Sequence, residues 1–125
     1  MNKIVLDTNI LVDALRGHVD SESYLEGLKE EDVYCSVITA AELWAGVRSH
    51  EMEELDLFLS AFRLIPVNEP VARQAGLYMQ KYAKSHGLLL PDALIAATAQ
   101  SIKARLMTHN RKHFPMSDVA VSAPY

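Results

Sequence analysis

The chain has 125 residues, of which 50% are hydrophobic and 22% are charged, and its formal net charge is −4. The length fits one domain, residues 1–125, and the composition excludes a disordered chain. An acidic chain does not bind nucleic acid by bulk charge alone, but an enzyme that acts on nucleic acid through metal ions stays open.

Membrane and disulfide-stabilised classes are also excluded by the residue pattern. No apolar run approaches the ~20 residues that span a bilayer, and the first residues lack the basic, apolar and small-residue regions of a signal peptide. We therefore expect a cytoplasmic protein that does not contact membrane. The single cysteine, Cys35, cannot form an internal disulfide and is expected to be a small buried side chain.

The first half of the chain alternates short apolar runs with longer periodic segments. Residues 3–6 predict a buried strand, and residues 8–16 predict a short helix with apolar side chains on one face and Gly17 beyond its end. The pattern then predicts, in order, a polar helix over 20–30, a strand over 33–36 and a helix within 36–49.

The second half continues this alternation. An apolar stripe predicts a helix over 50–62, and a short strand over 63–67 follows, in which Pro66 indicates an edge or an end. The segment 69–87 predicts a long helix that opens near a proline and stops at a glycine. An alanine-rich helix over 91–105, a strand over 106–108 and a last strand within 118–122 complete the predicted elements.

Strands separated by helices predict an α/β protein with a mainly parallel central sheet and helices on both faces, which is a three-layer α/β/α sandwich. In such sheets the functional site lies beyond the carboxyl ends of the strands. Asp7 directly follows the first predicted strand. We therefore expect the chemistry of the protein at this position.

Three acids are candidates for this chemistry, although each also has a structural explanation. Asp7 can cap the helix that follows it, Glu42 stands three residues after Thr39 as in a capping box, and Asp92 falls in the first turn of its helix. If the sheet gathers all three, the carboxylates repel one another and a divalent cation relieves the repulsion. Ligands that are all oxygen suit Mg²⁺ or Mn²⁺ rather than zinc.

A fourth segment, "MTHNRKHF", begins where a predicted strand ends. Thr108 and Asn110 in this segment could orient an acid, a water or a metal ligand. The alternative is a turn in which these side chains bond only to nearby backbone.

Four blocks occur in the order "IVLDTNILVDAL", "SVITAAELWAGV", "LLLPDALIAATA" and "LMTHNRKHF". Together they resemble the PIN-domain ribonucleases, in particular the VapC-type toxins of prokaryotic toxin–antitoxin pairs, over essentially the whole chain. The resemblance implies a compact α/β/α fold, one or two Mg²⁺ or Mn²⁺ ions, and cleavage of RNA. Carried over by position, it makes Asp7, Glu42 and Asp92 the metal-binding and catalytic acids.

The chain departs from the family pattern in one place. Many PIN domains have a fourth acid at the position of Asn110 or shortly after it, whereas this chain has none there. A neutral amide lowers the negative charge of the site by one, so it stays open whether one metal ion or two are bound.

The resemblance also implies a mechanism. Asp7 and Asp92 would hold Mg²⁺, with Glu42 binding directly or through water, and Glu42 would orient the attacking water or take its proton. The products would carry a 5′-phosphate and a 3′-hydroxyl. Four residues would support the acids: Thr8, Asn9, Thr108 and Asn110.

Basic residues near these blocks are candidates for RNA contacts. Arg111 and Lys112 form the densest basic run, with simple solvation as the alternative. Arg16 and Arg48 end the helices that carry Asp7 and Glu42 and could hold phosphates. Their alternative role is to complement the C-terminal end of a helix dipole.

Apolar residues suggest protein partners. Leu43 and Trp44 could line a groove for an amphipathic segment of a VapB-like antitoxin, or could be ordinary core. The helix that begins near Asp92 is apolar nearly all round and would need cover on two sides, which favours a homodimer, although packing within one chain explains much of this pattern. Whether dimers form larger toxin–antitoxin assemblies stays open.

Two other functions compete with a metal-dependent endoribonuclease. In haloacid-dehalogenase-type phosphatases a strand also ends in Asp, but that class expects a second acid two residues later, where this chain has Asn9. A catalytically weak binding protein, acting through its antitoxin or another partner, is favoured by the missing fourth acid. The sequence leaves open which RNA is cleaved, tRNA included.

Overall fold

The computed structural model of the chain describes residues 2–29 and 32–125. All five described strands join one parallel sheet in the order β3-β2-β1-β4-β5. The strands are β1 (Ile4–Leu6), β2 (Val33–Ser36), β3 (Arg63–Ile65), β4 (Arg105–Met107) and β5 (Val121–Ser122). The sheet confirms the predicted fold class. Pro66 directly follows β3, and β3 lies at the edge of the sheet. Both positions agree with the prediction that Pro66 marks an edge or an end of a strand.

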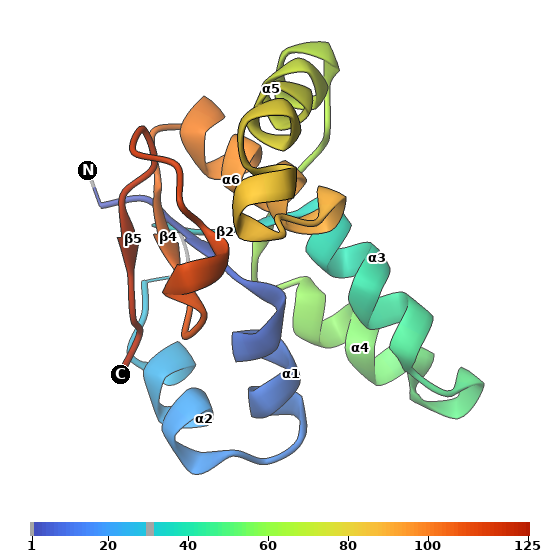
Figure 1. Cartoon of the computed structure of the whole chain (residues 1–125). Coiled ribbons are helices and arrows are strands. Elements are labelled where there is room, and N and C mark those ends of the chain that lie inside the picture. The colour runs from blue at the N-terminus through green and yellow to red at the C-terminus, as the bar shows by residue number, and fades with distance from the viewer. Residues whose placement is uncertain (1, 30–31) are drawn as a thin grey trace.

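Helices cover both faces of the sheet (Figure 1). In chain order they are α1 (Thr8–Leu15), α2 (Val19–Glu26), α3 (Val37–Gly46), α4 (Met52–Leu59), α5 (Glu69–His86) and α6 (Leu90–Ser101), with 3₁₀ turns η2 (Ser49–Glu51) and η3 (Arg111–His113). The second helix ends at Glu26, with Gly27 as its C-cap, and so is shorter than the predicted 20–30; residue 30 itself lies outside the described residues.

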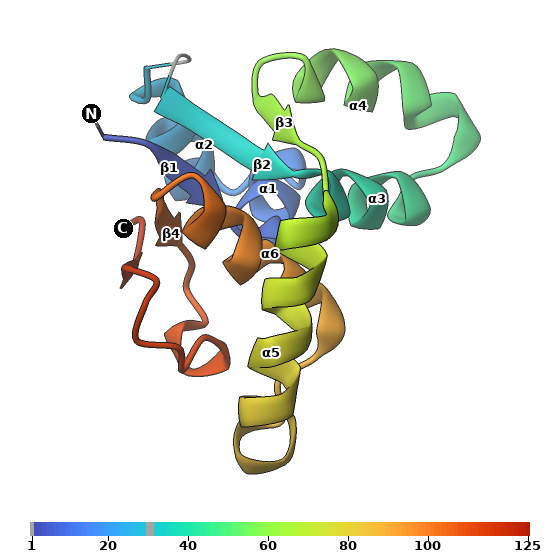
Figure 2. The same cartoon turned by 90° about the horizontal axis from the view of Figure 1, so that it is seen from above.

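Alternating side chains of the strands divide the core into two clusters. Val5 and Leu106 pack with α5, α6 and residues 114–119, whereas Leu6 and Met107 pack with α1 to α4. Successive side chains of a strand point to opposite faces, which accounts for this division. Figure 2 shows the resulting layers, with α5 and α6 on one side of β1 and β2 and α1 and α2 on the other.

Several predicted bounds need correction. The last helix ends at Ser101 rather than 105, because Lys103 adopts a left-handed φ of 55° and Arg105 already pairs in β4. The predicted helix over 50–62 is a 3₁₀ turn followed by α4, and β5 has only two residues. Thr108 lies just beyond β4 instead of inside it.

The apolar helix α6 does not need a second subunit to cover it. Its buried residues face the sheet on one side, and α5 packs along the other. Ala93, Ile95 and Ala97 are fully buried within the single chain. The all-round apolar pattern of α6 is therefore explained by packing within one chain, and it is not evidence for a dimer.

Two further features agree with the composition. Cys35 is buried, and burial raises the pKa of its thiol to about 12, as expected of a structural cysteine. No helix in residues 2–29 and 32–125 has both the length and the apolar character needed to cross a bilayer.

The order of the strands predicts a ligand-binding crevice beside β1, at the point between β1 and β4 where the order reverses. The chain moves outward from β1 through β2 to β3, then returns to the other side of β1 with β4. The connections that leave β1 and β4 diverge there, which is where open parallel sheets bind their ligands. Asp7 and Thr108 are the first residues after these two strands.

Two glycines of α5 provide a matched test of this fold. Gly87 ends α5 with φ of 65°, so Gly87→Ala should destabilise the protein by about 1 kcal/mol. Gly76 lies inside the helix and has open space where an added Cβ would lie, so Gly76→Ala should stabilise it by about 0.5–1 kcal/mol. Urea unfolding measures both. Equal effects of the two changes would contradict the left-handed helix end.

Candidate active site

Asp7 joins the two strands at the crevice. Its backbone N–H donates to the carbonyl of Met107 in β4 (3.0 Å). Its carboxylate, only 5% exposed, accepts the backbone N–H of Thr8 at Oδ1 (2.8 Å) and the hydroxyl of Thr108 at Oδ2 (2.7 Å). The predicted cap of α1 is therefore confirmed. The same carboxylate also accepts a hydrogen bond from Thr108, the first residue after β4.

Thr8 connects Asp7 to Glu42. Its hydroxyl donates to Oε1 of Glu42 (2.8 Å) and is 3.0 Å from the hydroxyl of buried Thr39. Glu42 lies in the second turn of α3 and does not form a capping box with Thr39, as the spacing suggested. Ser36 caps α3 instead, accepting the N–H of Ile38 (3.0 Å), because the helix begins directly after β2. Glu42 is thus free to face the crevice.

Asp92 completes the group of acids. It lies in the first turn of α6, as predicted, and is half-buried. Burial raises its pKa most, the charges of Asp7 and Glu42 raise the pKa further, and His113 lowers it. These charge effects indicate that Asp92 lies at the same end of the sheet as Asp7 and Glu42.

Burial also raises the pKa of Asp7, against the lowering effects of the Thr108 and Thr8 hydrogen bonds and of the His113 charge. The protein therefore keeps one of its acids, Asp7, where water is largely excluded. Such an arrangement costs stability and is typical of functional sites.

The residues present fit Mg²⁺ or Mn²⁺. The donors are carboxylate and hydroxyl oxygens, and the charges of Asp7 and Glu42 raise the pKa of Asp92, which a divalent cation would reverse. In the part of the chain that the structure describes, no group of three or more His, Cys, Asp or Glu side chains is placed so that it could hold a metal ion, so fewer than three protein carboxylates would bind it directly. Water and phosphate oxygens would therefore complete the coordination, as is usual for Mg²⁺.

The other residues predicted to support the acids have different surroundings. Thr108 is buried and also accepts the N–H of Asn110 (2.9 Å), so the predicted turn and the predicted support of an acid occur together. Asn9 is exposed on α1 beside Thr8. Thr8 and Thr108 therefore orient acids directly, whereas Asn9 stays a prediction.

The basic run after β4 lies between Thr108, which is hydrogen-bonded to Asp7, and His113. Arg111 and Lys112 are exposed on η3 and help to line a surface hollow formed by residues 109–113. His113, which ends η3, lies near both Asp7 and Asp92, since its charge lowers both pKa values. Sequence reasoning missed His113. The only sequence signal for it was its position, since His109 and His113 flank the basic run.

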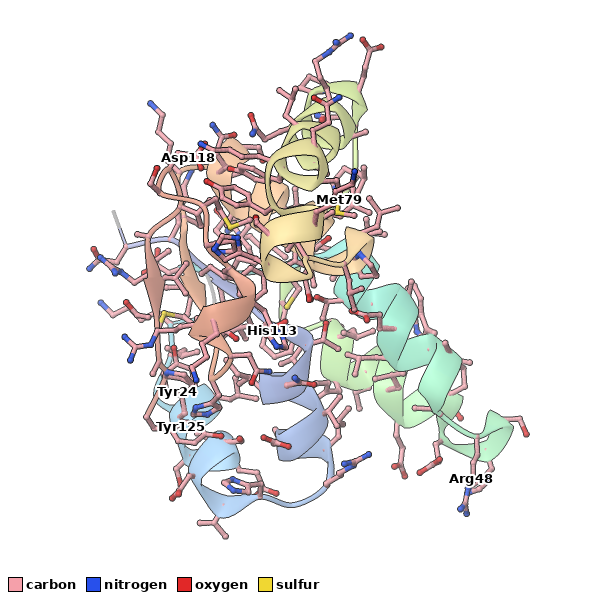
Figure 3. The ribbon with its side chains drawn as sticks, in the orientation of Figure 1. Tyr24, Arg48, Met79, His113, Asp118 and Tyr125 are labelled. Atoms are coloured by element: carbon pink, nitrogen blue, oxygen red, sulfur yellow. The ribbon has the colours of Figure 1, made fainter. Side chains whose placement is uncertain are left out.

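Arg16 and Arg48 lie at different places relative to the acids. Arg16 ends α1, about two and a half turns away from Asp7 along the helix. Arg48 follows α3, and Figure 3 places it at the outer tip of the α3–α4 pair, away from His113. Arg48 is therefore not part of the group that the fold brings together.

The residues predicted to bind an antitoxin also differ. Leu43 is 5% exposed and packs in the core, so its side chain is not available at the surface. Trp44 is 38% exposed, and its indole N–H donates to Asp56 of α4 (2.8 Å). Of the two, only Trp44 presents a surface to a partner.

Known proteins are similar to this chain in sequence and in fold. The model of the PIN domain family matches residues 4–120. Ribonuclease VapC10 of Mycobacterium tuberculosis is 40% identical over 115 residues, 90% of this chain and 86% of its own, and toxin FitB of Neisseria gonorrhoeae is 38% identical over 98% of each chain. A solved toxin–antitoxin complex from Klebsiella pneumoniae has a TM-score of 0.84 at 31% identity, covering 98% of both chains. The chain therefore belongs to the PIN-domain family.

The raised pKa of Asp7 predicts a gain in stability when its charge is removed. A group whose pKa is higher in the folded than in the unfolded state contributes stability below its unfolded pKa, near 3.9, and loses it as pH rises through the folded pKa. Asp7→Asn mimics the protonated form and can still accept the N–H of Thr8. In EDTA at pH 7 it should therefore melt at a higher temperature than the unaltered chain, with a difference that shrinks below pH 4.

Asp7→Ala is the matched control, because it removes the same charge together with the cap. Losing a cap costs about 0.5–2 kcal/mol. This variant should melt below Asp7→Asn at every pH. An Asp7→Asn variant that melts below the unaltered chain at pH 7 would contradict the cost assigned to the buried charge.

Proposed function

We propose that this chain is a metal-dependent endoribonuclease that acts as the toxin of a toxin–antitoxin pair. The observation that carries the proposal is the convergence of Asp7, Glu42 and Asp92 at the crevice beside β1, with Thr8 hydrogen-bonded to the first two. Relatives named as ribonucleases and as a toxin support it. The same proposal places the chain in the cytoplasm.

Asp7 and Asp92 are the proposed metal ligands, with Glu42 binding directly or through water. When bound, Mg²⁺ or Mn²⁺ supplies charge neutralisation at the phosphate and an activated water. Glu42 is exposed, and the hydroxyl of Thr8 fixes one of its oxygens. Its other oxygen is free to accept the proton of the attacking water.

The remaining groups position the substrate. Arg111 and Lys112 line the hollow that also contains His113, and would bind phosphates of the RNA, which the net charge of −4 otherwise repels. Arg16 would add a contact near α1. In-line attack by water would leave a 5′-phosphate and a 3′-hydroxyl. One metal ion suffices for this proposal, since Asn110 supplies no fourth carboxylate.

The proposed protein partner is a VapB-like antitoxin. Solved neighbours of this fold include the Klebsiella pneumoniae toxin–antitoxin complex and FitAcB from Neisseria gonorrhoeae, at 31% and 36% identity. Trp44 and the exposed Leu57 and Met52 of the neighbouring α4 give an apolar surface for an amphipathic segment. We also propose a homodimer, for which the exposed Leu77, Leu89 and Leu90 supply apolar surface.

A second candidate is a weakly catalytic binding protein. The observation that favours it is the neutral Asn110 together with His113, where many relatives in the family have an acid. Growth arrest on expression that survives loss of Asp7 would support this function.

Cleavage of total cellular RNA by the purified, antitoxin-free chain tests the proposal. With Mg²⁺ or Mn²⁺ we expect cuts at discrete sites, and none in EDTA. Asp7→Asn and Asp92→Asn should each abolish the cuts, because each removes a charged ligand. Mapping the cut ends identifies the RNA and its sites. Undiminished cleavage by a clean preparation of either variant would refute the assignment, and no cleavage by the folded unaltered chain would favour the binding function.

Thr8→Val tests whether Thr8 positions Glu42. Valine keeps the size and the backbone N–H that Asp7 accepts, but it cannot donate to Glu42. Loss of such an orienting contact should lower the cleavage rate about 10- to 100-fold. Thr8→Ser, which restores the hydroxyl, should recover most of the rate. Equal rates for the valine and serine variants would show that this hydrogen bond has no role.

A further inference from the structure

Four aromatic rings gather on the surface next to the basic loop. They are His18, Tyr24, His109 and Tyr125, called here the aromatic cluster. The ring centre of Tyr125 lies 4.4 Å from that of His109, 5.9 Å from Tyr24 and 6.1 Å from His18. Figure 3 shows Tyr24 and Tyr125 side by side next to α2. The rings come from α2 and its N-cap, from the loop after β4 and from the residues after β5.

Tyr125 is fixed at one end and open elsewhere. Its hydroxyl hydrogen-bonds to the hydroxyl of Ser21, which is fully buried in α2. Nevertheless, 45% of Tyr125 is exposed, and His18 and His109 beside it are exposed as well. The cluster is therefore held in place while it leaves aromatic surface to solvent.

The aromatic cluster adjoins the acids. His109 directly follows Thr108, whose hydroxyl holds Asp7 (2.7 Å). His109 also lines the hollow that contains Arg111 and Lys112. The segment 108–113 therefore connects Asp7, the two basic residues and the aromatic cluster.

We propose that the aromatic cluster is a stacking surface for an unpaired base of the RNA, close to the phosphate that is cleaved. This inference rests on the proposed function and deepens it, because it names the residues that would contact a base of the RNA. RNA with unpaired bases is recognised by aromatic rings that stack on exposed bases and by cations that follow the backbone. The ordering of Tyr125 before binding lowers the entropy that the bound complex must lose.

Binding by a variant that cannot cleave tests the inference directly. In the Asp7→Asn background, the affinity for a fluorescein-labelled single-stranded RNA of about 12 nucleotides, long enough to cross the site, is measured by anisotropy. Loss of one stacked base should weaken binding about 5- to 100-fold, so we expect this loss for Tyr125→Leu and for His109→Leu. Tyr125→Phe keeps the ring and should retain most of the affinity.

The chain offers a matched control. His86 in the last turn of α5 is also exposed and lies edge-on to a tyrosine, Tyr82, with ring centres 5.5 Å apart. It does not line the hollow beside the acids. His86→Leu should therefore leave RNA binding unchanged. Equal weakening by His86→Leu and His109→Leu would overturn the inference.

The outcomes separate the inference from the proposed function. If the unaltered chain cleaves RNA and the Leu variants bind as tightly as their parent, the aromatic cluster only fastens α2 to the loop, and the inference is wrong. If the parent does not bind RNA at all, the inference is also wrong. If the unaltered chain binds RNA through Tyr125 and does not cleave it, stacking stands and the proposed activity fails.

A second measurement avoids the risk that a substitution unfolds the chain. RNA that contains 4-thiouridine is cross-linked to the Asp7→Asn chain, and the attached peptides are mapped. We expect adducts on His109 or Tyr125. Adducts confined to the α3–α4 pair would overturn the inference.

Discussion

The buried carboxylate of Asp7 is the interaction on which the site depends. It begins α1, accepts the hydroxyl of Thr108 from the end of β4, and adjoins the threonine that holds Glu42 on α3. Asp7 and Thr8 together thus link three elements that are distant in sequence. Because the carboxylate loses most of its hydration, its pKa rises, and the two hydrogen bonds only partly offset this cost.

The cost of burying the Asp7 carboxylate is accepted at the place where the fold puts a ligand-binding crevice. Parallel strands with diverging connections leave a crevice beside β1, and the residues that follow β1 and β4 must lie in it. Apolar residues there would make a more stable protein. The charges of Asp7 and Glu42 raise the pKa of Asp92, and a cation bound during function would relieve this repulsion. Such a site exchanges stability for activity.

Most of the fold could be predicted from the sequence, because strand and helix periodicities and the prolines and glycines at helix ends are local signals. Asp7 and Asp92 could be predicted from their positions after a strand and at a helix start. The cap of α3 could not be predicted in this way. The sequence spacing favours Thr39 as the cap, but Ser36 is closer to the end of the strand and caps α3 instead. His113 and the aromatic cluster depend on contacts between distant segments: Ser21 and Tyr125 are 104 residues apart.

Direct measurement of metal binding tests the central claim, that the converging carboxylates form a divalent-cation site. Bound and free Mn²⁺ are counted by electron paramagnetic resonance for the unaltered chain, for Asp92→Asn and for Glu69→Gln, which removes the acid in the first turn of α5 instead of α6. We expect the unaltered chain and Glu69→Gln to bind Mn²⁺ equally and Asp92→Asn to lose most of this binding. Equal binding by all three would contradict a metal site at these acids.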